Sequence, residues 1–335
     1  MKTLEAIKPT LAFAGVGWIG RARLKAVAAT DLANISLISD PSVECINEAR
    51  KIALQSKTTN SFEEILSDHN IEGVVIATPS ALHKHQAVAA LQSGKAVFCQ
   101  KPLGRNFEEV KAVVHAAQEN NRILGADFSY RYTTAFQRIH SIIQSGELGK
   151  IFGVDLKFHN AYGPDKPWFY DLSLSGGGCV LDLGIHLIDL MLYALDFPEV
   201  TKVTSSLLCK GVSVKEKNEV EDYANASIEI ANDVTAQLAC SWNLSAGCEA
   251  VIEASFFGTH GGVALKNVNG SFYDFVGLRY RGTKTEILAS PPDDWGGKAL
   301  LDWIQKLSFS PAYNNEAAQY LKSAEVVDKI YGRID

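Results

Sequence analysis

The sequence lacks the features that define several large protein classes. Its six cysteines form no C-x-x-C pair and stand in apolar or strand-like stretches, which argues against disulfides and against zinc. It has no basic block, and 32 basic against 38 acidic residues give a net charge of −6, which argues against nucleic acid and anionic membranes as partners. No run of about eighteen apolar residues occurs, and the start, MKTLEAIKPT, has neither an apolar signal core nor a twin arginine. We therefore expect a cytoplasmic protein with reduced thiols and no membrane or nucleic-acid partner.

What is present is an ordinary globular composition in a long chain. Hydrophobic residues make up 47% and charged residues 21% of the 335 residues. A chain of this length exceeds one comfortable hydrophobic core, so we expect two domains.

A glycine-rich turn follows the first predicted strand. The stretch LAFAGVGWIG at 11–20 is an apolar strand that runs into Gly15-x-Gly17-x-x-Gly20, and a helix-like stretch comes after it. In a dinucleotide site, Gly15 would make the tight turn, Gly17 would let the backbone approach a pyrophosphate, and Gly20 would let the helix pack on the sheet. The motif alone is a weak signal, and a glycine turn without a ligand is the alternative.

An acidic residue at the end of the second strand strengthens this interpretation. ISLISD at 35–40 is a buried strand that ends in Asp40, twenty residues after Gly20. A carboxylate at this position binds both hydroxyls of an adenosine ribose and repels a 2′-phosphate. The sequence therefore favours NAD over NADP.

Strands and helices continue to alternate up to about residue 127, which predicts a doubly wound parallel sheet. A short helix is expected at 61–70, with Ser61 as its N-terminal cap and Glu64 three residues later. The other predicted strands are 73–80, 96–104 and 122–130, and the other predicted helices are 81–95 and 106–121. Ligands bind beyond the carboxyl ends of such strands, which here carry Asp40, Thr78-Pro79 and Gln100-Lys101.

The pattern changes in the second half, where apolar residues alternate with polar ones. Period-2 runs at 151–159, 223–231, 234–243 and 250–258 predict an antiparallel sheet that is apolar on one side. Phe152, Val154, Leu156 and Phe158 are expected on one face, as are Ala224, Ala226, Ile228 and Ile230. We expect a first domain at 1–127 and an α+β domain at 128–335, whose C-terminal helical segments at 296–310 and 315–334 can pack back on the first domain.

One predicted helix, GGGCVLDLGIHLIDLMLYAL at 176–195, is apolar except for three ionisable residues. Asp182, His186 and Asp189 are spaced so that they share one face of a helix. Burying unpaired ionisable groups is costly, so something must face them. From the residues alone, a satisfied buried pair and a functional site are equally acceptable interpretations.

Two segments resemble the GFO/Idh/MocA oxidoreductases. ATPSALHKHQAVAALQSGKAVFCQKPL at 77–103 resembles the family segment T-P-N-x-x-H … A-L-x-x-G-K-x-V-x-x-E-K-P-L, and residues 175–195 resemble G-G-G-x-x-x-D-x-G-x-H-x-x-D. The glycine motif and the Arg131-Tyr132 pair agree with the family as well. The resemblance implies a Rossmann domain, a second domain with an open antiparallel sheet, NAD(P)-dependent chemistry on sugars, inositols and related polyols, and a homodimer or homotetramer built through the open sheet.

The sequence departs from the family pattern at two positions. Gln100 stands where the family has a glutamate near the nicotinamide ribose, and Ser80 stands where the family has an asparagine. A glutamine keeps hydrogen-bonding capacity and loses the charge.

The resemblance also assigns roles to residues. Oxidation of an alcohol needs a group that takes the hydroxyl proton. His186, with an ordinary pKa of about 6.5, is expected as the general base. Lys101 is expected to hold and polarise the substrate oxygen or to share the proton transfer. Asp182 is expected to bind a substrate hydroxyl or to support the lysine. Asp189, one helical turn further on, is expected to fix the helix. The alternative is that Lys101 has no catalytic role and is an ordinary surface lysine that follows a strand.

Further residues complete the expected sites. The residues expected to bind the cofactor are Gly15, Gly17, Trp18, Ile19, Gly20, Asp40, Thr78, Pro79, His83 and Gln100. Arg131, Tyr162 and Trp168 are candidate substrate contacts, although the aromatic loop at 159–175 can equally be a packed loop. His83 and His85 point different ways on a helix, so no metal site is expected.

Three functions remain open from the sequence. The first is an NAD-dependent dehydrogenase or ketoreductase of a sugar, inositol or amino sugar. The second is a non-catalytic NAD(P)-binding sensor, and the third is an enzyme that oxidises, eliminates and reduces again on a tightly held NAD. The retained Lys101, Asp182 and His186 favour the first.

Overall fold

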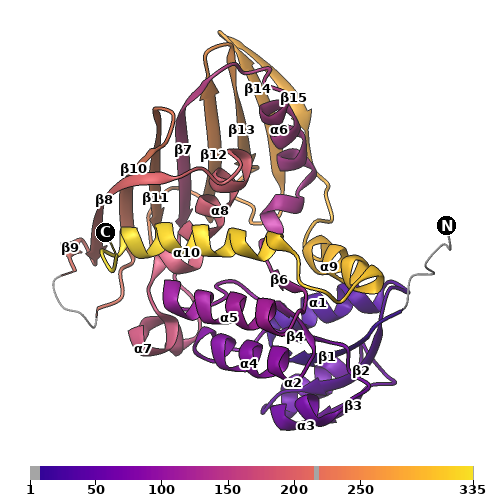
Figure 1. Ribbon diagram of the computed structural model, residues 1–335. Helices are drawn as coiled ribbons and strands as arrows, with labels where there is room; N and C mark the ends of the chain where they lie inside the picture. Colours follow the sequence, from indigo (N-terminus) through magenta and orange to yellow (C-terminus); the bar gives the residue numbers. More distant parts are fainter. Residues whose placement is uncertain (1–7, 215–218, 335) are drawn as a thin grey trace, which may run out of the picture. The chain divides into compact units, whose positions relative to one another are not determined.

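The chain divides into two units, each with its own sheet (Figure 1). The computed structural model describes residues 8–214 and 219–334. Most of the N-terminal stretch MKTLEAIKPT at 1–10, which was considered above for a signal sequence, lies outside the described residues. Unit 1 comprises Met1–Ser129 and Gly296–Leu321, and unit 2 comprises Tyr130–Trp295 and Lys322–Asp335.

Unit 1 contains a six-stranded parallel sheet in the order β3-β2-β1-β4-β5-β6. Its strands are β1 (Thr10–Ala14), β2 (Asn34–Ser39), β3 (Lys57–Thr59), β4 (Gly73–Ile76), β5 (Ala96–Cys99) and β6 (Leu124–Ala126). Its helices are α1 (Trp18–Ala28), α2 (Val43–Arg50), α3 (Phe62–Ser67), α4 (Ser80–Gln92), α5 (Phe107–Glu119), α9 (Lys298–Phe309) and the 3₁₀ turn η4 (Asn315–Ala318). The doubly wound parallel sheet expected from the alternating pattern is confirmed.

Local signals explain where several helices begin and end. Asn106 caps α5 by accepting a hydrogen bond from the Glu109 backbone N–H, and Gly94 follows α4 with a φ of +80°, which suits glycine. Ser61 precedes α3 as expected, but its side chain does not cap the helix. Its hydroxyl donates to Glu63 instead, so the expected capping role of Ser61 is wrong.

Helix α9 belongs to unit 1 although it lies far away in the sequence. Its Trp303 is buried and contacts Phe98 of β5, with ring centroids 5.8 Å apart. A Cβ on Gly73 or Gly125 would come within 2.8 or 2.7 Å of the Trp303 ring. Glycines on β4 and β6 therefore make room for the indole on one face of the sheet.

Unit 2 contains a nine-stranded sheet in the order β15-β14-β13-β12-β7-β11-β10-β8-β9. Its strands are β7 (Ile151–Asn160), β8 (Val200–Cys209), β9 (Val212–Ser213), β10 (Tyr223–Ile230), β11 (Val234–Ser241), β12 (Ala250–Gly258), β13 (Gly261–Asn267), β14 (Phe275–Arg281) and β15 (Lys284–Ala289). The sheet is antiparallel, as expected, except that β7 and β11 pair in parallel, which makes it mixed. The segment 268–295 contains the hairpin of β14 and β15.

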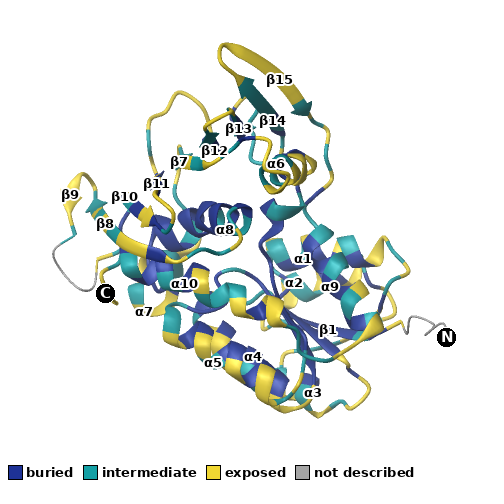
Figure 2. Ribbon diagram, turned by 45° about the horizontal axis from the view of Figure 1, so that its top comes forward, coloured by how far each residue is buried: buried dark blue, intermediate teal, exposed yellow. Residues whose placement is uncertain are grey.

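The alternation predicted for the sheet of unit 2 is largely confirmed. Ala224, Ala226, Ile228 and Ile230 are all buried, as are Val154, Leu156 and Phe158. Phe152, expected with them, is 50% exposed. Figure 2 shows α8 (Ile185–Ala194) buried, and its contacts with β7 and β12 place it against the middle of this sheet.

The apolar segment of unit 2 is a broken helix. It consists of α7 (Leu172–Ser175), the π-helical segment η3 (Val180–Gly184) and α8. By length and composition the segment Leu172–Ala194 could cross a membrane, a possibility the sequence had not indicated, but 83% of its apolar window is buried inside the fold. Burial of this kind is that of a core helix. The remaining helical segments are η1 (Ser129–Tyr132), α6 (Thr134–Gln144), η2 (Pro167–Tyr170) and α10 (Gln319–Ile330).

Candidate functional site

The backbone of the glycine turn in unit 1 leaves open space at the N-terminus of α1, where a phosphate could lie. Gly15 has a φ of +83°, and a Cβ there would lie 2.7 Å from the Ala77 backbone. A Cβ on Gly20 would lie 2.2 Å from the Gly15 carbonyl oxygen, whereas a Cβ on Gly17 would meet nothing within 4 Å. Helix α1 then begins at Trp18 without a side-chain cap. Two glycines are thus required by packing, and the third borders open space at a helix N-terminus, where an anion is favoured.

Asp40 stands beside this turn at the end of β2. Its Oδ2 accepts a hydrogen bond from the Val16 backbone N–H at 2.8 Å, and its Oδ1 accepts one from the Ser42 N–H at 2.8 Å. The residue is half-buried. A carboxylate has about four acceptor positions, so capacity remains for two hydroxyl donors. Together with the turn, this donor and acceptor set fits a dinucleotide whose ribose carries free hydroxyls.

His83 links two loops at the carboxyl edge of the same sheet. Its buried ring bridges the backbone carbonyls of Thr78 and Pro102, with 2.7 Å from Nε2 to the first and from Nδ1 to the second. Burial lowers the pKa of His83, and the two carbonyls oppose that shift. The histidine therefore fixes the loop after β4 to the loop that carries Lys101.

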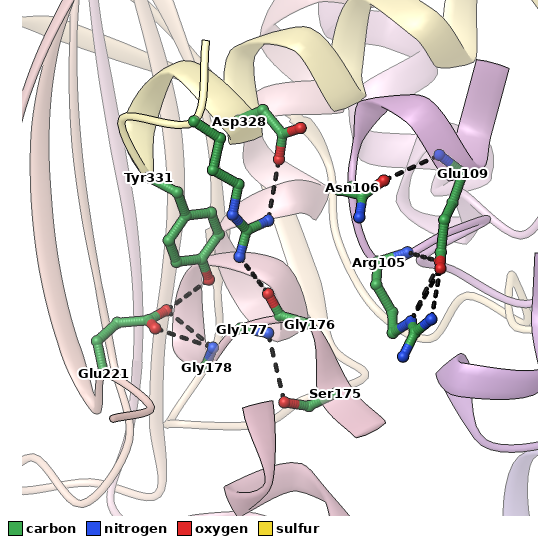
Figure 3. Close-up of polar contacts among 11 residues, drawn as sticks. Arg105, Asn106, Glu109, Ser175, Gly176, Gly177, Gly178, Glu221, Asp328 and Tyr331 are labelled. Carbon is green, nitrogen blue, oxygen red and sulfur yellow. Dashed lines mark hydrogen bonds and ion pairs between the residues drawn. The ribbon is translucent and has the colours of Figure 1, made fainter. Parts of the chain in front are cut away.

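The loop after β5 is held at its other end as well (Figure 3). The Arg105 backbone N–H donates to Glu109 Oε2 at 2.8 Å, and the Arg105 guanidinium pairs with the same carboxylate. A Cβ on Gly104 would come within 2.7 Å of the Glu109 Cβ. Half-buried Lys101 thus begins a loop that His83 and Glu109 hold in place.

Gln100 belongs to a buried network that the sequence did not reveal. Its Nε2 donates to Asp127, whose carboxylate also pairs with Arg23 at 2.5 Å and accepts the Ser129 hydroxyl. All four side chains are buried. The one signal in the sequence was the glutamine itself, which stands where the family has an acid.

In unit 2, Asp182 and His186 are distinguished from their surroundings by exposure. Between Ser175 and Leu192, they are the two residues that are not buried. The Trp242 indole N–H donates to Asp182 Oδ2 at 3.1 Å, and the His186 ring meets the edge of Tyr130, with centroids 4.7 Å apart. An acid and an imidazole therefore reach solvent together from an otherwise buried helix.

Asp189 does not share that half-exposed face, contrary to the expectation from helical spacing. It is buried and forms two hydrogen bonds with the Arg131 guanidinium, at 2.6 and 2.5 Å, and the Ser323 hydroxyl lies 3.4 Å away. The same guanidinium lies over the rings of Tyr193 and Phe197. Arg131, expected as a substrate contact, is thus paired with a buried acid, and this pair connects Asp189 of α8 to η1.

A second buried acid, Glu221, anchors the start of this helix (Figure 3). Its carboxylate accepts the Gly178 N–H at 2.9 Å, the Val180 N–H at 3.0 Å and the Tyr331 hydroxyl at 2.7 Å. Burial raises the pKa of Glu221, and these three donors act in the opposite direction. Sequence reasoning missed Glu221 and Tyr331, because neither lies near the helix in the chain.

The glycine triplet is explained by the same contacts. Gly176 ends α7 with a φ of +83°. A Cβ on Gly177 would lie 2.2 Å from the Tyr331 hydroxyl oxygen, and a Cβ on Gly178 would lie 1.9 Å from the Glu221 carbonyl oxygen. The triplet therefore lets the segment before β10 and Tyr331 approach the helix backbone closely.

The aromatic loop expected to contact substrate is partly packed. The Trp168 ring stacks on Phe169 with centroids 3.8 Å apart, whereas Tyr162 is 50% exposed and lies 6.2 Å from Phe272. Trp168 is thus packed within the loop, whereas the Tyr162 side chain is open to solvent. Within residues 8–214 and 219–334, no group of three or more His, Cys, Asp or Glu side chains is placed to hold a metal ion.

Comparison with known protein families gives matches over most of the chain. A model described as an oxidoreductase family with an NAD-binding Rossmann fold matches residues 10–128. A model described as the GFO/IDH/MocA C-terminal domain matches residues 136–264.

Individual relatives and structures are also similar. Levoglucosan dehydrogenase of Pseudarthrobacter phenanthrenivorans is 32% identical over 57% of this chain and 53% of its own. The 1,5-anhydro-D-fructose reductase of Ensifer adhaerens is 30% identical over 54% of each chain. The chain thus spans about half the length of these curated relatives. A structure of levoglucosan dehydrogenase with NADH and levoglucosan has a TM-score of 0.84 at 22% identity, over 97% of both chains, which shows a shared fold.

Proposed function

The chain belongs to the GFO/IDH/MocA family of oxidoreductases, and from that membership we propose that it is an NAD-dependent dehydrogenase or reductase. It would transfer a hydride between nicotinamide and a secondary alcohol or ketone of a sugar, inositol or amino-sugar derivative. The observation that carries this proposal is that Asp182 and His186 are only partly buried, whereas every other residue from Ser175 to Leu192 is buried. Ionisable groups that are only partly buried on an otherwise apolar helix mark a candidate functional site.

Each proposed catalytic residue has a role set by its chemistry. NAD, when bound, supplies the hydride acceptor. His186 takes the hydroxyl proton, since an imidazole accepts protons near neutral pH. Asp182, oriented by the Trp242 indole, binds a neighbouring hydroxyl. Lys101, at the end of β5, donates to the oxygen that becomes a carbonyl and stabilises its developing charge.

The preference for NAD over NADP rests on Asp40. Its carboxylate stands beside the glycine turn, and both oxygens are already oriented by backbone N–H groups. An additional phosphate on the ribose would meet this fixed negative charge. We propose Gly15, Gly17, Trp18, Ile19 and Gly20 as the pyrophosphate contacts, with Thr78, Pro79, His83 and Gln100 lining the rest of the cofactor site.

We base the proposed substrate class on the named relatives and not on individual substrate-binding residues. Two relatives are named for anhydro sugars, levoglucosan and 1,5-anhydro-D-fructose. We propose a sugar or polyol substrate, with these two compounds to be tested first. We further propose a cytoplasmic homodimer or homotetramer built through the sheet of unit 2.

The test is NADH formation, followed by absorbance, across anhydro sugars, aldoses, inositols, amino sugars and sugar acids. Lys101→Ala is measured in parallel, with Lys111→Ala on the exposed face of α5 as the matched control. We expect the unsubstituted protein to turn over one group of compounds. Lys101→Ala should lose about a hundredfold or more of this turnover, while its NADH affinity stays within a few-fold of that of the unsubstituted protein.

Other outcomes separate the alternatives. Tight NADH binding with no turnover on any compound would favour the sensor. Product formation without stoichiometric NADH release would favour the cycle of oxidation, elimination and reduction. Full turnover in Lys101→Ala would remove Lys101 from the mechanism.

A further inference from the structure

The buried network around Gln100 joins the end of β5, the end of β6 and helix α1. The Asp127 backbone N–H donates to the Cys99 carbonyl at 2.9 Å, which places Asp127 directly beside the end of β5. Arg23 of α1 donates from Nε to Asp127 at 2.5 Å and from a terminal nitrogen to Ser129 at 2.9 Å. Asp127 thus accepts from Arg23, Ser129 and Gln100 in a region closed to solvent.

This arrangement dictates which end of the Gln100 amide faces Asp127. A carboxylate is an acceptor only, so the glutamine must present its Nε2 hydrogen to it. The other end of the amide, Oε1, is thereby turned away from Asp127. Within the described part of the chain, Oε1 takes no hydrogen bond from another residue.

We propose that Asp127 and Arg23 are positioning residues that hold Gln100 so that its Oε1 faces the nicotinamide half of the cofactor as a pure acceptor. The inference rests on the proposed function. Gln100 immediately precedes Lys101 at the carboxyl end of a parallel strand, which is where ligands bind in open α/β sheets. A hydroxyl or amide N–H of the bound cofactor is the donor that Oε1 would accept.

The same network explains why this position is neutral. A glutamate at position 100 would set a second carboxylate against Asp127, and one of the two would have to be protonated. Protonated, that glutamate would reproduce the glutamine: its O–H would donate to Asp127 and its carbonyl would face the cofactor. Ionised, it would repel Asp127. The neutral Gln100 therefore suits the neighbouring Asp127, because the pair carries a single negative charge. That charge lies on Asp127, where Arg23 pairs with it.

The pair can be tested with Gln100→Glu, Asp127→Asn and the double variant, with exposed Gln92→Glu as the matched control. Urea unfolding of the cofactor-free protein and NADH affinity by fluorescence titration are each measured from pH 5.5 to 8.5. We expect Gln100→Glu to match the unsubstituted protein at the acidic end. At the alkaline end it should lose stability, and its NADH affinity should fall about tenfold, the equivalent of one hydrogen bond.

The double variant provides the decisive comparison. When Asp127→Asn is already present, the carboxylate introduced at position 100 supplies the negative charge that Arg23 needs, so Gln100→Glu should then raise the unfolding midpoint. A Gln100→Glu protein with the pH profile of the unsubstituted protein would overturn the inference, as would an equal loss with and without Asp127→Asn. Failure of the unsubstituted protein to bind NADH would instead refute the proposed function, and the unfolding measurements would still report the coupling.

Discussion

Replacing Glu221 should unfold the helix start that carries Asp182. In Glu221→Ala the Gly178 N–H, the Val180 N–H and the Tyr331 hydroxyl lose their acceptor. A buried donor left without a partner costs about 1–3 kcal/mol. Water can enter the space left by the side chain, so we take the lower end for each of the three donors. The expected loss is about 3 kcal/mol of unfolding free energy.

Two further variants make this prediction specific. Glu221→Gln keeps the shape and one acceptor oxygen but loses the charge, so it should lose about 1–2 kcal/mol. Glu229→Ala on β10 removes the same side chain from a surface pair with Lys202, in which both side chains are more than half exposed. That control should lose less than about 1 kcal/mol.

The assay is urea unfolding followed by tryptophan fluorescence, with an unchanged dependence on denaturant required for the comparison. The order of loss should be Glu221→Ala, then Glu221→Gln, then Glu229→Ala. A Glu221→Ala protein as stable as the Glu229→Ala control would refute the reasoning that this acid anchors the helix. The measurement needs neither cofactor nor substrate, so it is independent of the proposed function.

Three further predictions concern unit 1. Asp40→Ser should weaken the preference for NADH over NADPH in binding titrations, because it removes the charge that repels a 2′-phosphate; an unchanged ratio would mean that Asp40 does not contact the ribose. Gly20→Ala should lose about 1–3 kcal/mol of stability because its Cβ would meet the Gly15 carbonyl, whereas Gly17→Ala should keep its stability and lose NADH affinity; equal stabilities would contradict the steric argument. Burial lowers the pKa of His83, so its contribution to stability is present above about pH 6.5 and is lost as the pH falls toward its folded pKa. His83→Gln should therefore flatten the loss of stability below about pH 6.5 in acid titrations of the unfolding midpoint, and an unaltered slope would assign that loss to other groups.

The sequence predicted those features that local patterns determine. The parallel sheet of unit 1 and the glycine turn depend on residues that are neighbours in the chain, and both are confirmed. The alternation of β10 is confirmed for the same reason. The parallel pairing of β7 with β11 was not predicted, because period-2 alternation is the same for parallel and antiparallel neighbours.

The site was predicted less completely, because its supports are remote in the sequence. Arg23 and Asp127 are 104 residues apart, and Tyr331 is 110 residues from Glu221. No spacing rule connects such pairs. Helical spacing also predicted that Asp189 lies on one face with His186. Asp189 is instead buried against Arg131, because a carboxylate that is buried without a partner is costly.

The path of the chain through unit 1 has a consequence for its synthesis on the ribosome. Unit 1 is interrupted after Ser129 and resumes at Gly296, so α9 is translated only after the whole intervening segment. Until then the face of the sheet at Gly73 and Gly125 lacks the indole of Trp303 that fills it. A nascent sheet with an uncovered apolar face is prone to aggregate. The segment up to Ser129 should therefore depend on chaperones until α9 has been translated, and a fragment ending at Ser129 should be insoluble unless a peptide spanning α9 is supplied.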